Sequence, residues 1–330
     1  MRPPAFWANA PDQPGIMARL LSPLGALYAA ATARRLRSPG YTAKIPVICI
    51  GNLNAGGTGK TPTTIAVIER LAQRGHASVH IVSRGYGGRI SGPIRVDPGR
   101  HTAADVGDEP LLLAAFAPTW VSRDRAAGVQ AAEDAGATAI LLDDGFQTPS
   151  VVKSLSIIVV DAAQGFGNGR CIPAGPLREP ITTGLARADF LLSIGTPADQ
   201  TRFNALWGAN ITLPHLTGHL APLKMGMDWH GLRVLAFAGI GHPEKFFTTL
   251  RGEGAIIAAT VALDDHQPLS PALMQRLQAQ AKSLHAQLVT TEKDAARLPD
   301  SFRAEVLTLP VRLQLQDWSP LDAALSKLGL

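Results

Sequence analysis

A glycine-rich stretch at residues 51–61, GNLNAGGTGKT, constrains the fold of this chain more than any other feature. Before it, residues 45–50 (IPVICI) form an apolar, β-branched run that is typical of a buried parallel strand. After it, Pro62 stands where proline is tolerated in the first turn of a helix, and apolar residues continue at helical spacing to Leu71. A strand, a glycine-rich loop and a helix in this order favour a phosphate-binding loop over an ordinary glycine-rich turn.

The residue types of this loop suit a nucleotide phosphate. Backbone N–H groups of such a loop converge on phosphate oxygens, and the N-terminus of the following helix favours an anion. The lysine adds a cation and the threonine hydroxyl after it suits Mg²⁺. The usual pattern has glycine at the first position; here it is asparagine, the next residue most tolerant of left-handed backbone. We therefore expect nucleotide-phosphate contacts from Asn54, Ala55, Gly56, Gly57, Thr58, Gly59, Lys60 and Thr61.

The composition is that of a folded globular protein, with 46% hydrophobic and 17% charged residues. A length of 330 residues suits one large domain or two modest ones. The 31 basic and 26 acidic residues give a net charge of +5, which favours anionic partners: nucleotides, nucleic acid or an acidic membrane surface. Two cysteines without zinc-type spacing make no disulfide framework, so a reducing, cytosolic setting is expected.

The N-terminal segment, residues 1–44, differs from the rest because an apolar run at residues 16–33 is followed by several arginines. A membrane-spanning helix needs about 20 uninterrupted apolar residues, and Arg19 and Pro23 make the fit poor. A secretory signal would carry its positive charge before the apolar run. We interpret the segment as an interfacial anchor with arginines at anionic headgroups; the alternative is a helix packed on the protein's own core.

A second informative stretch is residues 138–147, in which an apolar strand ends in Asp143 and Asp144. In phosphate-loop enzymes an acid at such a strand end holds Mg²⁺, directly or through water. Because adjacent side chains on a strand point to opposite faces, we expect one of the two to be a direct ligand unless the strand has already ended.

Three further loops carry charge beside glycine or proline. The stretch at 83–89 (SRGYGGR) places an arginine at a strand end, which suits an anionic ligand or a solvated turn. The two acidic residues of 107–110 (GDEP) precede a helical run. They either stabilise the N-terminus of that helix or face the active-site cleft. Residues 165–180 form a long irregular loop, a feature that is usually functional or mobile.

Strands alternating with helices predict an α/β fold of the P-loop NTPase type, with a mostly parallel sheet flanked by helices. Ligands of such sheets lie beyond the carboxyl ends of the strands, where all these loops are expected. The pattern restarts near residue 233, which predicts a second, smaller α/β domain. We therefore expect three parts: the N-terminal segment 1–44, a core domain 45–228 and a C-terminal domain 229–330.

Eight motifs together resemble the tetraacyldisaccharide 4′-kinases, the lipid A pathway kinases of Gram-negative bacteria. The resemblance covers nearly the whole chain, and the motifs occur in the order of that family. They are GNLNAGGTGKTP (51–62), SRGYGG (83–88), GDEP (107–110), LLDDGFQ (141–147), GFGNGRCIPAGPLREP (165–180), AGIGHPEKFF (238–247), DDHQ (264–267) and TTEKDAAR (290–297).

The resemblance implies transfer of the γ-phosphate of ATP to the 4′-hydroxyl of a tetraacyldisaccharide 1-phosphate, giving lipid IVA, with Mg²⁺ required. It implies a peripheral protein on the cytoplasmic face of the inner membrane, with the acylated glucosamine disaccharide phosphate and the anionic membrane surface as partners. We expect neither nucleic acid nor an obligate protein as a partner.

The resemblance also assigns roles, with the smaller domain closing over ATP. It implies that Asp108 is the catalytic carboxylate and that His266, which could otherwise be a surface histidine, is the partner of Asp108. Lys60 is the third residue expected to be catalytic. The expected metal or active-site groups are Thr61, Asp143, Asp144 and Glu179, and the candidates for contact with substrate phosphate are Arg84 and Arg178.

Two other phosphate-loop classes fit less well. A GTPase usually has an N-K-x-D motif, and the nearest match, residues 292–294 (EKD), lacks its residues and spacing. An ATP-driven switch or metal-insertion protein usually carries a lysine just before the paired glycines, where this chain has Ala55. Nucleic-acid binding also fits less well, because aromatic residues make up only 5% of the chain and the sequence shows no motif for stacking on bases.

Overall fold

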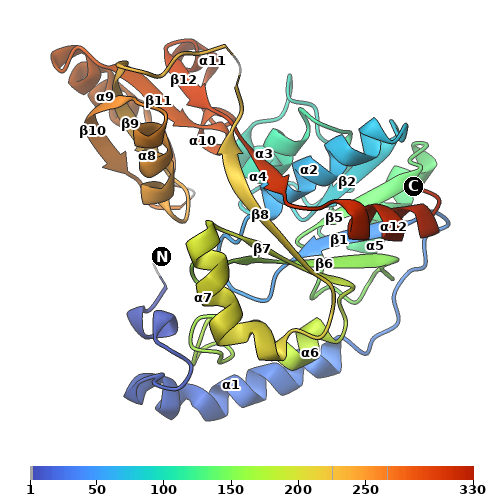
Figure 1. Cartoon of the computed structure of the whole chain (residues 1–330). Helices are drawn as coiled ribbons and strands as arrows, with labels where there is room; N and C mark the ends of the chain where they lie inside the picture. The colour runs from blue at the N-terminus through green and yellow to red at the C-terminus, as the bar shows by residue number, and fades with distance from the viewer. Residues whose placement is uncertain (1–2, 225, 266) are drawn as a thin grey trace.

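The chain forms two β-sheets flanked by helices in this computed structural model (Figure 1). The structure describes residues 3–224, 226–265 and 267–330. Within these residues the larger sheet has nine strands in the order β13-β8-β7-β6-β1-β5-β2-β4-β3, and the smaller has four in the order β10-β9-β11-β12. The strands of the larger sheet are β1 (Val47–Gly51), β2 (Val79–Ser83), β3 (Ile94–Arg95), β4 (Thr119–Val121), β5 (Ala139–Asp143), β6 (Leu155–Asp161), β7 (Phe190–Ile194), β8 (His215–Pro222) and β13 (Val311–Leu315). Those of the smaller sheet are β9 (Arg233–Ala238), β10 (Ile256–Ala262), β11 (Gln287–Thr291) and β12 (Val306–Leu309).

The helices of the described residues lie before, between and after these strands. They are η1 (Ala5–Ala8), α1 (Ile16–Arg35), α2 (Lys60–Gln73), α3 (Ala103–Val106), α4 (Asp108–Leu113), α5 (Arg125–Asp134), α6 (Ile181–Leu185), α7 (Pro197–Trp207), η2 (Gly208–Asn210), α8 (Pro243–Gly252), α9 (Pro271–Ser283), α10 (Glu292–Ala295), α11 (Asp300–Arg303) and α12 (Ser319–Lys327).

Strand β1 lies at the centre of the larger sheet, parallel to β5 on one side and to β6 on the other. Its register pairs Ile50 with Asp143 and Gly51 with Ile158. The whole of β1, β5 and β6 is buried, as expected for β-branched strands covered on both faces. The predicted α/β fold with a mostly parallel sheet flanked by helices is confirmed, and the loops after β1, β2, β5 and β6 share one edge.

Helices cover both faces of each sheet. On the larger sheet, buried residues of α2, α4 and α12 share one hydrophobic cluster, whereas those of α5, α6 and α7 share the other. On the smaller sheet, α8 packs on one face through Phe247 and Leu250, and α9 packs on the other through Leu277. Each unit therefore has a core of its own.

The C-terminal residues do not stay with the smaller sheet, to which we assigned the chain as far as residue 330. Strand β13 pairs antiparallel with β8 in the larger sheet, and α12 buries Leu321 and Leu325 in the core beside α2. Arg70 of α2 also pairs with Asp322 of α12. The apolar face of α12 finds its partner on the larger unit, so the smaller unit comprises residues 233–309.

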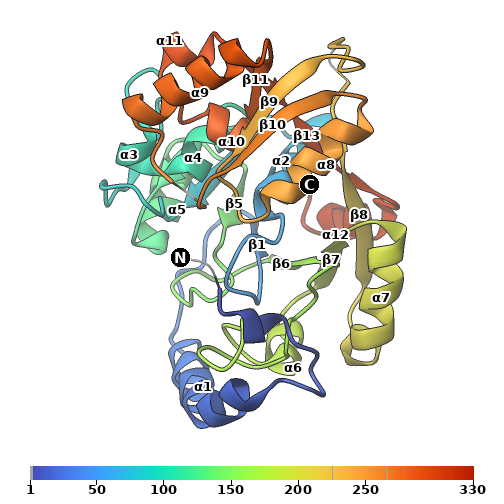
Figure 2. The same ribbon diagram turned by 90° about the vertical axis from the view of Figure 1, so that its left-hand side faces the viewer.

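Helix α1 lies at the end of the molecule away from the smaller sheet (Figures 1 and 2). It is continuous through Pro23, a residue that had argued against a spanning helix. Among the described residues it is the one helix long and apolar enough to cross a membrane by length and composition, and most of it is not buried in the protein. One face, containing Ala18 and Gly25, packs on the protein, and a Cβ at Gly25 would lie 2.8 Å from the Cys171 carbonyl oxygen.

Candidate active site

The phosphate loop runs from the end of β1 to the start of α2 at Lys60. Gly59 has φ 97°, and a Cβ there would lie 2.7 Å from the Cδ1 atom of Ile194, so both the backbone angle and the packing require glycine. Gly56 has φ 127°, and no described heavy atom lies within 4 Å of an added Cβ at Gly56 or Gly57. The loop thus turns tightly into the helix and leaves its glycine backbone open to a ligand.

A buried hydroxyl in this loop supports a phosphate ligand. Thr58 is 6% exposed, and its Oγ1 has no hydrogen-bond partner among the described residues. Buried polar groups are nearly always hydrogen-bonded, so such an atom indicates a missing acceptor. Phosphate oxygens at the N-terminus of α2 would supply that acceptor.

Asp144 faces the phosphate loop. Its Oδ1 lies 3.6 Å from Lys60 Nζ and accepts a hydrogen bond of 3.0 Å from Arg178 Nη1. Strand β5 ends at Asp143, and Asp144 has a left-handed φ of 53°, so the alternation expected of strand side chains does not apply. Burial alone would raise the pKa of Asp144, but the charges of Lys60 and Arg178 outweigh burial and the pKa is lowered.

Asp143 has a different environment. Its carboxylate is buried and accepts a 3.0 Å hydrogen bond from Ser83 Oγ, at the end of β2. Burial, and then the charge of Asp144, raise the pKa of Asp143 to about 6. The buried guanidinium of Arg125 donates to the Asp143 carbonyl at 3.2 Å and holds the strand end. A divalent cation beside Asp143 would compensate this buried charge.

Glu179, one of the expected metal or active-site groups, forms an ion pair with Arg187. Arg187 Nη2 donates to both of its carboxylate oxygens at 2.6 and 2.7 Å, and Gln147 Nε2 donates at 3.0 Å. The Arg187 guanidinium also lies 4.2 Å from the centre of the Phe146 ring. No group of three or more His, Cys, Asp and Glu residues within 3–224, 226–265 and 267–330 could hold a metal. Glu179 is thus neutralised by Arg187, and it orders the loop that carries Arg178.

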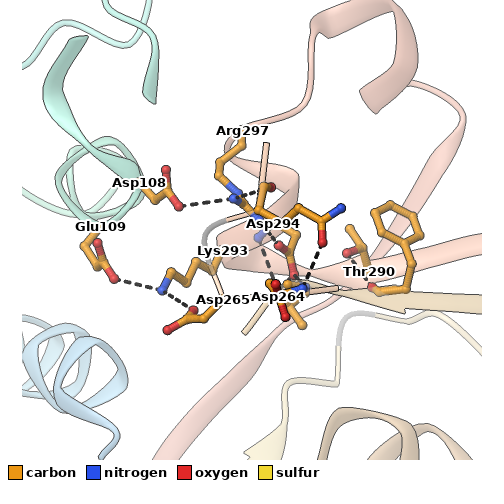
Figure 3. A network of polar contacts seen from close by, with 12 residues as sticks. Asp108, Glu109, Asp264, Asp265, Thr290, Lys293, Asp294 and Arg297 are labelled. Carbon is orange, nitrogen blue, oxygen red and sulfur yellow. Dashed lines mark hydrogen bonds and ion pairs between the residues drawn. The ribbon is translucent and has the colours of Figure 1, made fainter. Parts of the chain in front are cut away.

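Asp108 and Glu109 open helix α4 and face the smaller unit (Figure 3). Asp108 Oδ2 lies 3.4 Å from Arg297 Nη1, and Glu109 Oε1 lies 2.8 Å from Lys293 Nζ. Lys293 also lies 3.5 Å from Asp265. Burial alone would lower the pKa of Lys293, but Glu109 and then Asp265 outweigh it and the pKa is raised. Two ion pairs therefore join α4 to the smaller unit.

Arg297 is held firmly within the smaller unit. It forms an ion pair with Asp294, and its Nη1 donates to the Gln267 carbonyl at 3.1 Å. Asp294 in turn accepts hydrogen bonds from the Gly239 amide and the Thr291 hydroxyl. Neither Arg297 nor Lys293 was assigned a role from the sequence, although both lie in the motif TTEKDAAR (290–297).

Two other predicted site residues have different outcomes. Arg84 is exposed at the carboxyl end of β2, directly after Ser83, which donates to Asp143. His266 lies outside the described residues. The structure thus brings together Lys60, Asp144 and Arg178.

A phosphate loop at the centre of a parallel sheet, an acidic neighbouring strand end and a helical lysine define a P-loop protein of the nucleotide-binding α/β class. The family model for tetraacyldisaccharide-1-P 4′-kinase matches residues 17–329. The chain belongs to this family and is a kinase of lipid A biosynthesis. The resemblance inferred from the motifs is therefore confirmed.

Known proteins similar to this chain support the same assignment. A tetraacyldisaccharide 4′-kinase of Dinoroseobacter shibae is 67% identical over 330 residues, covering 99% of this chain and 98% of that protein. One of Rhodospirillum rubrum is 48% identical, covering 100% and 98%. A crystal structure described as the "apo" form of LpxK from Aquifex aeolicus in complex with ATP has a TM-score of 0.75 at 23% identity, covering 95% of this chain and 99% of that one. It shows the same fold.

Proposed function

We propose that this chain transfers the γ-phosphate of ATP to the 4′-hydroxyl of a tetraacyldisaccharide 1-phosphate, giving lipid IVA. The observation that carries the proposal is the arrangement of Lys60 and Arg178 around Asp144 beside an open phosphate loop. The match of the family model to nearly the whole chain supports the choice of substrate.

Phosphoryl transfer depends on positioning and on neutralising charge, and the site supplies both. The backbone N–H groups of the loop and the Thr58 hydroxyl bind the phosphates of ATP, and Lys60 adds a cation. Arg178 is the proposed cation for the transferred phosphate. Hydrogen bonds to Asp144 Oδ1 and, at 3.3 Å, to Gln147 Oε1 hold its guanidinium in place. Arg84 provides a further cation at the same edge of the sheet.

We expect Thr61 and Asp143 to hold Mg²⁺, with phosphate oxygens and water completing the coordination. Asp143 suits a cation because its buried carboxylate accepts a hydrogen bond from the neutral Ser83 hydroxyl, whereas Asp144 already pairs with Lys60 and Arg178. When bound, Mg²⁺ would supply neutralisation of phosphate charge. Glu179, whose two oxygens accept hydrogen bonds from Arg187, stays a predicted metal or active-site group.

Asp108 is the proposed general base, accepting the proton of the 4′-hydroxyl as the new bond to phosphorus forms. His266 is proposed as its partner. Three cross-unit pairs support closure of the smaller unit over ATP: Asp108 with Arg297, Glu109 with Lys293, and Asp161 with Lys245 at 2.5 Å. We propose the smaller α/β unit, residues 233–309, as the closing domain.

Helix α1 is proposed to contact the cytoplasmic face of the inner membrane. Its exposed face carries five large apolar side chains, while the opposite face packs on the protein. Large exposed apolar patches mark membrane or partner contacts, and arginines at the end of the helix suit anionic headgroups. The five side chains are Ile16, Met17, Leu20, Leu24 and Leu27.

The proposal is tested by measuring ATP turnover with and without tetraacyldisaccharide 1-phosphate in mixed micelles. We expect turnover to require the lipid, because a kinase transfers the γ-phosphate of ATP to its acceptor and forms ADP only when that acceptor is bound. Turnover at the same rate without the lipid would instead favour an ATP-driven switch.

A further inference from the structure

The phosphate loop is tied to the long loop 165–180, which we name the bridging loop. Asn54 stands where the usual pattern has glycine; it is 7% exposed, and its Nδ2 donates to the Gly165 carbonyl at 3.0 Å. At the other end of the bridging loop, the Ala55 amide donates to the Pro176 carbonyl at 2.7 Å, and the Arg178 amide to the Leu53 carbonyl at 2.7 Å. The asparagine that departs from the motif therefore forms one of three hydrogen bonds that fix the loop.

The other side of the bridging loop is tied to the N-terminal residues. The backbone N–H of Asn168 donates to the Trp7 carbonyl at 2.9 Å, and the side-chain Nδ2 of Asn168 donates to the Phe6 carbonyl at 3.1 Å. Trp7 Nε1 donates to the Pro173 carbonyl at 3.1 Å. Further along, Arg170 Nη1 donates to Ser22 Oγ of α1 at 2.7 Å. Both η1 and α1 are thus joined to the same loop that contacts the phosphate loop.

Asn168 connects the two sides. It is 2% exposed, and its Nδ2 also donates to the Ala174 carbonyl at 2.9 Å, while its Oδ1 accepts from the Arg170 amide. A Cβ at Gly175 would lie 2.0 Å from Asn168 Oδ1, so only glycine fits there. Because the loop is held by buried hydrogen bonds and close contacts, we expect a displacement at one side to affect the other.

We propose that the N-terminal residues support the nucleotide site through the bridging loop, with Asn168 and Asn54 acting as positioning residues for the phosphate loop. The inference rests on the proposed binding of ATP at this loop. It gives the N-terminal residues a second role beside membrane contact: through the bridging loop they contribute to the affinity for ATP. Trp7 contributes through its indole hydrogen bond to the bridging loop.

The test is equilibrium binding of the fluorescent analogue mant-ATP to the full-length protein in detergent, without lipid substrate. Asn168→Ala and Trp7→Phe are compared with Gln13→Ala, whose exposed side chain lies in the same segment. We expect each of the first two to weaken binding roughly 3- to 10-fold, the effect of losing one or two buried hydrogen bonds. KM for ATP should rise with little change in kcat, a separation that general loss of folded protein would not produce.

A double-mutant cycle identifies the route. Asn54→Gly restores the glycine of the usual motif and removes the bond to Gly165. If the coupling passes through the bridging loop, the two substitutions act on the same connection. The double variant should then weaken mant-ATP binding by less than the product of the two single fold-changes. Effects that multiply fully would overturn the route.

The remaining outcomes also decide the proposal. Unchanged mant-ATP affinity in folded Asn168→Ala and Trp7→Phe proteins would overturn it while leaving the nucleotide site intact. If thermal unfolding shows that Asn168→Ala does not fold, Trp7→Phe decides alone, since an aromatic ring remains at this position and the indole N–H donor to Pro173 is lost. Failure of the unaltered protein to bind mant-ATP would overturn the nucleotide site, and this inference with it.

Discussion

The guanidinium of Arg297 lies 3.4 Å from the carboxylate of Asp108, although the two residues belong to different α/β units. Both side chains are largely buried, 7% and 11% exposed. Removing one member of a buried ion pair leaves the other without compensation, so such a pair strongly constrains its geometry. The smaller unit therefore contributes to the orientation of the proposed base.

Replacing Arg297 tests this relationship. Arg297→Gln should lower kcat by roughly 10-fold or more, because Asp108 loses the ion pair that joins it to the smaller unit. The affinity for mant-ATP should change little. Arg276→Gln, at an exposed position of α9, is the matched control and should match the unaltered enzyme. An unchanged kcat in Arg297→Gln would show that the ion pair has no part in catalysis.

Asp108 itself should be more sensitive. Asp108→Asn keeps the shape of the side chain but removes the proton acceptor, so we expect kcat to fall about 10²- to 10⁴-fold with ATP affinity retained. Glu109→Gln, which breaks the neighbouring pair with Lys293, should have a much smaller effect. Steady-state kinetics with both substrates provide the measurement; equal losses in the two variants would remove the special role of Asp108.

The exposed face of α1 predicts membrane affinity. Combined replacement of Leu20, Leu24 and Leu27 by Ser should weaken co-sedimentation with anionic vesicles by at least 10-fold, because each buried leucine contributes about 1.5–3 kcal/mol. Val152→Ser removes an exposed apolar side chain outside this face and serves as the control. Equal sedimentation of the triple variant and the unaltered protein would contradict membrane contact through α1.

Asp322 predicts a pH dependence of stability. Its hydrogen bonds from Arg70, followed by the charges of Arg70 and Arg74, hold the pKa of Asp322 below its usual value. A carboxylate whose pKa is lowered by folding stabilises the protein above the unfolded pKa, and this contribution is lost as pH falls through the folded pKa. Asp322→Asn should therefore reduce the free energy of unfolding by about 1 kcal/mol at pH 7.

Urea unfolding at several pH values checks this prediction. The difference between Asp322→Asn and the unaltered protein should shrink below pH ~4, where the carboxyl of the unfolded chain is protonated. A difference that stays constant down to pH 3 would mean that the charge of Asp322 is not the source of the stabilisation.

Local features of the sequence predicted most of the core. The strand, loop and helix around Lys60 are contiguous, so glycine spacing and apolar periodicity are sufficient to identify them. Strand β13 could not be assigned to the larger sheet in this way, because its pairing with β8 joins residues nearly a hundred positions apart and leaves no periodic signal. The alternation of apolar and polar residues at 311–315 (VRLQL) is compatible with a strand in either sheet.

The site was predictable where one motif contains the chemistry and its context. Asp144 beside Lys60 follows from the phosphate loop and the neighbouring strand end. The pairing of Glu179 with Arg187 was not predicted, because a lone arginine in a loop has no positional signature. Likewise, Arg297 lies on a charged stretch that resembles a solvated surface until the two units are placed together.

The most direct test of the proposed reaction is transfer of labelled γ-phosphate from ATP with Mg²⁺ to tetraacyldisaccharide 1-phosphate. Lys60→Ala is the variant, and Lys282→Ala, at an exposed position of α9, is the control. We expect label on the lipid with the unaltered protein and with Lys282→Ala, and loss of transfer with Lys60→Ala. Intact ATP hydrolysis without label on the lipid would contradict the lipid-kinase function while retaining the phosphate loop.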